Sequence, residues 1–80
     1  MAWPTDDPDA YFASRGFALA VYEDAIEGDW SADLLSGDRE RMLQRRYGSG
    51  ASANDAALRA QRRYHVEQEP GRPPLPHRLP

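Results

Sequence analysis

The tetrapeptide Gln-Arg-Arg-Tyr occurs twice in this 80-residue sequence, and each copy joins side chains that suit the binding of anions and flat rings. Arginine keeps its positive charge and donates paired hydrogen bonds to carboxylates or phosphates, and tyrosine offers a ring for stacking. The repeat therefore predicts a partner-binding surface. Its members are Arg45, Arg46, Tyr47, Arg62, Arg63 and Tyr64.

Three interpretations of the repeat stay open. Arginines near the C-terminal end of a helix complement the helix dipole without any partner. They also pair with carboxylates of a partner protein or of a second copy of the chain. As a third option they neutralise the phosphates of a nucleic acid, whose unpaired bases would stack on the tyrosines. The net charge of −3 favours a protein partner or self-association, because dedicated nucleic-acid binders usually carry a positive total.

No residues of the chain have the spacing of a catalytic centre. Cysteine is absent, and His65 and His77 have no neighbours suited to metal binding or to activation of a nucleophile. The three aspartates between residues 6 and 9 lack the spacing of a calcium-binding EF-hand, and residues 48–50 lack the lysine of a phosphate-binding loop. We therefore expect a protein that is not an enzyme and that needs no cofactor or metal.

Charge is divided between the two halves of the chain. Residues 1–38 contain nine acidic residues and one arginine, whereas residues 39–80 contain nine arginines and four acidic residues; lysine is absent. This polarity suits head-to-tail assembly or pairing of the two halves within one molecule. No apolar run is long enough for a membrane span and no signal peptide is recognisable, so we expect a cytoplasmic protein or a component of a viral particle.

The apolar pattern predicts an all-α fold, a small bundle of two to three helices. Asp7 followed by Pro8 is a typical helix start, and Phe12, Leu19 and Ile26 recur every seven residues, so the first helix is expected over 8–27. Further helices are expected over 39–47 and 53–68. In this bundle the side chains expected to form the core of the first helix are Phe12, Leu19, Tyr22 and Ile26. As an alternative to the second helix, residues 36–38 would turn a hairpin between 33–35 and 42–43.

Glycine and proline predict the connections and the end of the chain. Residues 48–52, rich in Gly, Ser and Ala, are expected to be a flexible link between helices. Residues 69–80 contain five prolines and are expected to form an extended tail beside a helical domain at 1–68. We interpret this tail as an arm that contacts a neighbouring subunit. Its candidate contact residues are Arg72, Pro73, Pro74 and Pro76.

In size, in an N-terminal amphipathic helix and in an Ala/Leu-rich C-terminal helix with an arginine-containing tail, the chain resembles small head-to-tail joining proteins of tailed phages. It shares no specific motif with them, and residues 30–47 offer no convincing counterpart of their central hairpin, so we assign no family. Our first hypothesis is a non-enzymatic assembly or adaptor subunit of a larger complex, for which a phage particle is one setting. The alternative is a small regulatory protein that binds nucleic acid or inhibits a nucleic-acid-binding enzyme.

Overall fold

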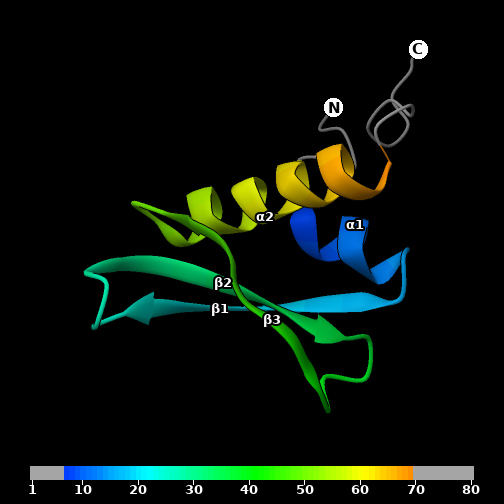
Figure 1. Cartoon of the computed structure of the whole chain (residues 1–80), viewed down its shortest axis with the longest axis horizontal. Coiled ribbons are helices and arrows are strands. Elements are labelled where there is room, and N and C mark those ends of the chain that lie inside the picture. Colours follow the sequence, from blue (N-terminus) through cyan, green and yellow to red (C-terminus); the bar gives the residue numbers. More distant parts are fainter. Residues whose placement is uncertain (1–6, 70–80) are drawn as a thin grey trace.

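The computed structural model describes residues 7–69, which form a three-stranded antiparallel sheet with two helices over one of its faces (Figure 1). The elements follow in the order α1 (Pro8–Ala13), β1 (Phe17–Asp24), β2 (Asp29–Ser36), β3 (Met42–Gly50) and α2 (Ala53–Gln68). The strands lie in the order β1-β2-β3, so that β1 and β3 are the edges. The prediction of an all-α bundle, a small helical protein, is therefore wrong, because the described residues form an α/β fold.

The first helix begins where the sequence predicts and ends much earlier. Asp7 caps α1 by accepting a hydrogen bond from the backbone N–H of Ala10 at 3.2 Å, and Pro8 occupies the first turn. The helix ends at Ala13, and the chain turns at Gly16, whose φ of 83° lies in the left-handed region. Glycine adopts this conformation without steric cost. The expected helix over 8–27 is thus replaced by one short helix and a strand.

Residues 17–24 form a strand because their apolar side chains alternate. Leu19 lies opposite Leu34 of β2, and Val21 lies opposite Ala32, so these side chains share the face that the helices cover. The heptad spacing that suggested a long helix does not describe the core. Ile26 lies in the turn after β1 and is 89% exposed, and Tyr22 lies on the open face of the sheet, where its hydroxyl donates to Asp33.

The alternative hairpin for residues 33–43 is the arrangement that the structure contains. Leu35 lies opposite Met42, and residues 37–41 connect β2 to β3. The Ser36 hydroxyl donates to the Asp38 carboxylate at 2.6 Å, and the Arg41 N–H donates back to the Ser36 hydroxyl at 3.1 Å. The helix expected over 39–47 is therefore wrong, because backbone pairing with β2 outweighs the local preference of this segment.

The last helix agrees with the prediction over its whole length. Ser52 caps α2 by accepting a hydrogen bond from the Asp55 N–H at 3.1 Å, and the helix ends at Gln68. Its small side chains face the sheet, with Ala56 and Ala60 fully buried. Small residues allow a close approach of backbone to backbone, although each buries little apolar area.

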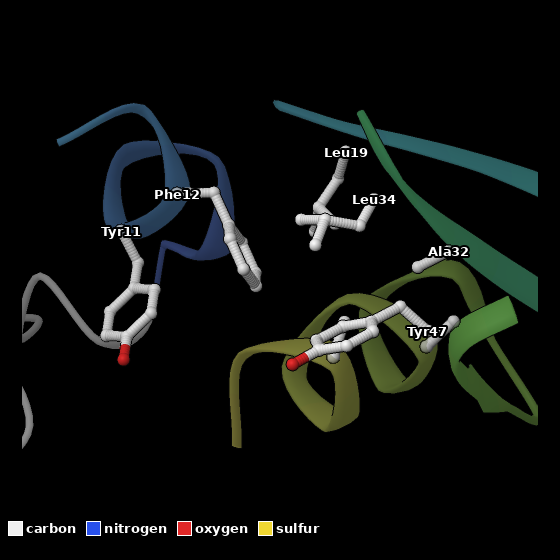
Figure 2. Close-up of a cluster of buried hydrophobic side chains, with 8 residues drawn as sticks. Tyr11, Phe12, Leu19, Ala32, Leu34 and Tyr47 are labelled. Atoms are coloured by element: carbon white, nitrogen blue, oxygen red, sulfur yellow. The ribbon is translucent and has the colours of Figure 1, made fainter. Parts of the chain in front are cut away.

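The core lies between the sheet and the two helices (Figure 2). Figure 2 shows Leu19 and Leu34 pointing from the sheet towards the rings contributed by α1 and β3. An aromatic cluster fills the end near α1, where the ring of Phe12 meets that of Tyr64 edge to face at a centroid distance of 5.5 Å. The buried apolar residues are Tyr11, Phe12, Leu19, Ala32, Leu34, Tyr47, Ala56 and Ala60.

Residues 48–50, expected to be a flexible link, belong to β3 and pack directly under α2. A Cβ atom built on Gly48 would lie 2.3 Å from the Ala56 carbonyl oxygen and 2.4 Å from the Ala60 nitrogen. Only a residue without a side chain allows the strand and the helix to come this close. The glycine is therefore a packing requirement and not a source of flexibility.

A group of polar side chains ties α1 to the C-terminal end of α2, and we call it the terminal clasp. Arg15 donates from Nε and Nη2 to the two carboxylate oxygens of Glu69 at 2.9 and 2.7 Å. The Tyr11 hydroxyl donates to the same carboxylate at 3.2 Å, and the Arg15 guanidinium lies 3.8 Å from the centre of the Tyr11 ring. Burial, together with Glu69, raises the pKa of Tyr11 to about 12, so its hydroxyl stays a donor.

Candidate functional site

The two copies of Gln-Arg-Arg-Tyr adopt different structures and touch each other. The first copy lies in β3 and the second lies in α2. The guanidinium of Arg63 lies 4.4 Å from the centre of the Tyr47 ring, and its Nη1 donates to the Tyr47 carbonyl oxygen at 3.3 Å. Because one copy is part of a strand and the other is part of a helix, the repeat is not a repeated structural unit.

Both tyrosines of the repeat serve the core. Tyr47 is 6% exposed, and its hydroxyl donates to the Glu67 carboxylate at 3.1 Å. Burial raises the pKa of Tyr47 to about 12. Tyr64 packs edge to face against Phe17 at a centroid distance of 5.5 Å, as it does against Phe12. Both rings are thus engaged in packing within the chain.

Arg46 pairs with the acidic half of the same chain. It donates from Nη1 to Asp29 at 2.7 Å and to Asp24 at 3.2 Å, and from Nη2 to the second oxygen of Asp29 at 3.2 Å. The hydroxyl of Ser31 accepts from Arg46 at 2.8 Å and donates to Asp24 at 2.7 Å. These contacts raise the pKa of Arg46, chiefly through the hydrogen bond to Asp29. The Nη1 and Nη2 donors of Arg46, which the sequence predicted to bind a partner, are therefore engaged within the chain.

A bulge in β3 gives Arg46 this position. Its φ of 46° is left-handed, which is unusual for a residue with a side chain, and the register of β3 against β2 shifts between Ala32 and Leu34. The backbone N–H of Arg46 donates to the Asp33 carboxylate at 2.9 Å, which supports the unusual conformation. Arg46 therefore reaches the turn between β1 and β2, whereas Tyr47 enters the core.

The carboxylates around Arg46 make the stability of the fold depend on acidity. Hydrogen bonds from Ser31 and from the Glu27 N–H lower the pKa of Asp24, and the hydrogen bond from Arg46 lowers that of Asp29. A group with a lowered folded pKa stabilises fully above its unfolded pKa, here about 3.9, and loses this contribution as the pH falls through its folded pKa. Arg46→Met is expected to lower the melting temperature at pH 7 and to weaken the fall of melting temperature between about pH 5 and pH 2.

Thermal unfolding followed by circular dichroism at a series of pH values measures both effects. Arg45→Met is the matched control, because Arg45 is the exposed neighbour of Arg46 on the same strand. Equal melting curves for the two variants at pH 7 would show that the Asp24 and Asp29 contacts do not contribute to stability.

The exposed arginines of the second copy lie on one side of α2 with residues that the repeat did not include. Positions 55, 58, 59, 62 and 63 share one side of the helix and line a shallow depression. Arg59 and Arg62 are exposed, and neither forms an ion pair within residues 7–69. We call this surface the arginine face, and its residues are Asp55, Leu58, Arg59, Arg62 and Arg63.

A second open depression, of about 300 Å³, lies between α2 and the sheet, and it shares Arg63 with the arginine face. Phe17 and Leu34 contribute apolar lining, and Leu43 of β3, itself 41% exposed, lines it as well. We call it the β3–α2 cavity. Its polar and aromatic lining comes from Gln44, Tyr47, Arg63, Tyr64, Glu67 and Gln68.

Sequence reasoning identified Arg62 and Arg63 as surface residues and missed Arg59, Leu43 and Glu67. A helical projection of residues 53–68 would have found two of these, because residues three or four apart share a helix face. Arg63 donates to Glu67 at 3.0 Å across one turn, and this contact lowers the pKa of Glu67. The place of Leu43 depends on the β2–β3 hairpin and has no local signal.

Of the remaining residues predicted to contact a partner, Arg45 lies within the described part of the chain and the residues of the tail lie outside it. Arg45 lies exposed on β3, apart from the arginine face. Arg72, Pro73, Pro74 and Pro76 lie outside the described residues, as does most of the predicted tail.

Residues 7–69 contain no group of three or more His, Asp or Glu side chains that could hold a metal ion. Within the same range, neither helix is long and apolar enough to cross a membrane.

Protein-family models, curated proteins and solved structures were compared with this chain, and none matches it.

Proposed function

We propose that this protein is a non-enzymatic assembly or adaptor subunit that docks an acidic segment of a partner protein on the arginine face of α2. The single observation that carries the proposal is that Arg63 lines both the arginine face, which carries the exposed Arg59 and Arg62, and the partly apolar β3–α2 cavity. Protein interfaces combine such a pocket for an apolar anchor with a polar rim that provides specificity.

A protein segment fits this surface better than a nucleic acid does. The arginine face carries three arginines and one aspartate, and Glu67 already pairs with Arg63. A phosphate backbone gains affinity from each neutralised phosphate and would meet few free cations here. The tyrosines that could have stacked on bases are engaged in the core. An acidic peptide needs only two or three carboxylate contacts and one apolar side chain for the cavity.

Arg59→Gln with Arg62→Gln is expected to weaken binding of an acidic peptide roughly five-fold, since each exposed ion pair contributes about 0.5 kcal/mol. The probe is a fluorescein-labelled peptide with one isoleucine between pairs of glutamates, and fluorescence anisotropy measures its affinity at low and moderate salt. Arg39→Gln with Arg41→Gln is the matched control, because both residues lie exposed in the turn between β2 and β3.

Two further probes separate the alternatives. A peptide with lysine in place of glutamate is expected to bind at least ten times more weakly, as is a single-stranded oligonucleotide of equal charge. Tighter binding of the oligonucleotide, with a steep dependence on salt, would replace this proposal by the nucleic-acid function. Equal losses in the two double variants would show that only the overall charge of the protein matters.

A further inference from the structure

The most exposed large apolar side chain of the described residues lies at the turn between β1 and β2. Ile26 is 89% exposed and lies between two exposed acidic residues, Glu23 and Glu27. Neither glutamate forms an ion pair within residues 7–69. We call residues 23–27 the acidic tip. A single exposed isoleucine is ordinary for a protein surface, so its meaning depends on how the turn is held and on what surface would fit it.

The acidic tip is held rigidly. The Asp24 carboxylate accepts hydrogen bonds from the backbone N–H groups of Ile26 and Glu27, both at 3.1 Å, and the Gly28 N–H donates to the Asp24 carbonyl at 2.8 Å. Arg46 also holds the turn in place, because it binds Asp24 at the end of β1 and Asp29 at the start of β2. A contact segment that is already ordered loses less conformational entropy on binding.

The chemistry of the acidic tip is complementary to the docking surface of the same protein. Each joins an apolar group to charges, with Ile26 between glutamates on one surface and Leu43 with the cavity beside arginines on the other. Opposite charges around an apolar contact steer two surfaces together and fix their register. The segregation of charge along the chain thus corresponds to two separate surfaces.

The acidic tip and the β3–α2 cavity lie at opposite ends of the sheet, and the arginine face extends along α2 from Asp55 to Arg63 (Figure 1). In Figure 1 the turn between β1 and β2 is at one end of the sheet, whereas the C-terminal half of α2, which lines the cavity, is at the other. One molecule of this shape therefore cannot fill its own cavity with its own tip. A contact between unlike surfaces of identical chains is heterologous, and it produces rings or open chains instead of a symmetric dimer.

We propose that the partner docked on the arginine face is a second copy of this chain, which inserts Ile26 of its acidic tip into the β3–α2 cavity and pairs Glu23 and Glu27 with Arg59 and Arg62. This inference rests on the proposed function and names the partner. The contact is heterologous, so that each molecule offers one tip and one cavity to its neighbours.

Variants of the two surfaces test the inference through complementation. Ile26→Ser removes the apolar anchor, and Arg59→Glu with Arg62→Glu reverses the charge of the receiving surface. Sedimentation velocity of the full-length chain is expected to show assembly that grows with protein concentration. Each variant alone is expected to self-associate at least about ten times more weakly. An equal mixture of the two is expected to form dimers and nothing larger, because only one intact tip and one intact cavity remain.

Circular dichroism shows that each variant is folded, and Met42→Ser is the control, since Met42 is an exposed apolar residue that lines neither the arginine face nor the β3–α2 cavity. Self-association that survives in the Ile26→Ser variant, or a mixture that stays monomeric, overturns the inference. A wild-type protein that is monomeric up to millimolar concentration overturns it as well. In that last case, binding of the acidic peptide to the arginine face would leave the proposed function standing, and absence of peptide binding would remove both.

Discussion

Gly48→Ala is expected to lower the free energy of unfolding by about 3 kcal/mol or more, which is a large part of the stability of a domain of this size. The added methyl group would lie 2.3 Å from the Ala56 carbonyl oxygen and 2.8 Å from the Ala60 Cα. Both atoms belong to the backbone of α2, so no side-chain rotation relieves the clash. The helix must move away from the sheet and so open the core. Urea unfolding followed by circular dichroism measures the change.

Two neighbouring substitutions make this prediction specific. At Gly50 a new Cβ would lie 2.5 Å from the Cβ of Asp55 and 3.1 Å from the Ala56 nitrogen, so that one contact lies under 3.0 Å, whereas three do at Gly48. Gly50→Ala is therefore expected to cost less than Gly48→Ala. Ser49→Ala, between them in β3, is expected to cost under about 1 kcal/mol. Equal losses at positions 48 and 49 would contradict the close approach of helix and sheet.

Phe12→Ala is expected to cost about 3 to 5 kcal/mol, the range for removing a large aromatic side chain from a core. Phe12 is fully buried, and its ring meets Tyr11 at 5.3 Å and Tyr64 at 5.5 Å between centroids, in both cases edge to face. Such ring pairs contribute beyond the area that they bury. The helix α1 has six residues and is too short to form alone, so loss of this anchor is expected to release it.

Thermal unfolding checks this second prediction, with an expected fall in melting temperature of more than about 12 °C. Phe12→Leu keeps most of the apolar volume and is expected to lose less than half as much stability as Phe12→Ala. Val66→Ala removes apolar atoms from a position that is 61% exposed and is expected to melt close to the wild type. A Phe12→Ala protein that melts with the Val66 variant would mean that α1 does not contribute to the cooperative fold.

The starts of α1 and α2 and the length of α2 were predictable from the sequence, because they depend on residues that are close together in the chain. The capping of α1 by Asp7 and of α2 by Ser52 follows from side chains that bond to backbone groups three positions away. The length of α2 follows from its composition, which contains no glycine or proline between residues 53 and 68. These signals act over a few residues along the chain, so they can be recognised without knowledge of the tertiary fold.

The sheet was missed because residues 17–24 satisfy two patterns at once. Leu19 belongs to a heptad with Phe12 and Ile26 and also to an alternation with Phe17 and Val21. The first pattern predicts a helix and the second predicts a strand. Pairing with β2 decides between them, and pairing depends on residues that are distant in the sequence. Gly48 was misinterpreted for the same reason, since its role becomes visible only when α2 lies against it.

The candidate site was predictable in its charges and not in its geometry. The division into an acidic and a basic half correctly included pairing within one molecule as an option, and Arg46 with Asp24 and Asp29 provides an example. Nothing local indicates that Arg46 adopts a left-handed conformation or that Arg63 covers the Tyr47 ring. The repeat identified residues that lie next to each other, although for the wrong structural reason.

The terminal clasp has a mechanical consequence. Arg15 and Tyr11 fasten the first helix to Glu69, the last residue that the structure describes, so a force that pulls residues 7 and 69 apart acts first on these side chains. Hydrogen bonds between side chains break one after another, whereas the ladders of the sheet are not in the direct line of load. Under tension transmitted along the chain, α1 would therefore detach first, while the three strands and α2 keep their packing and act as the part that resists extension.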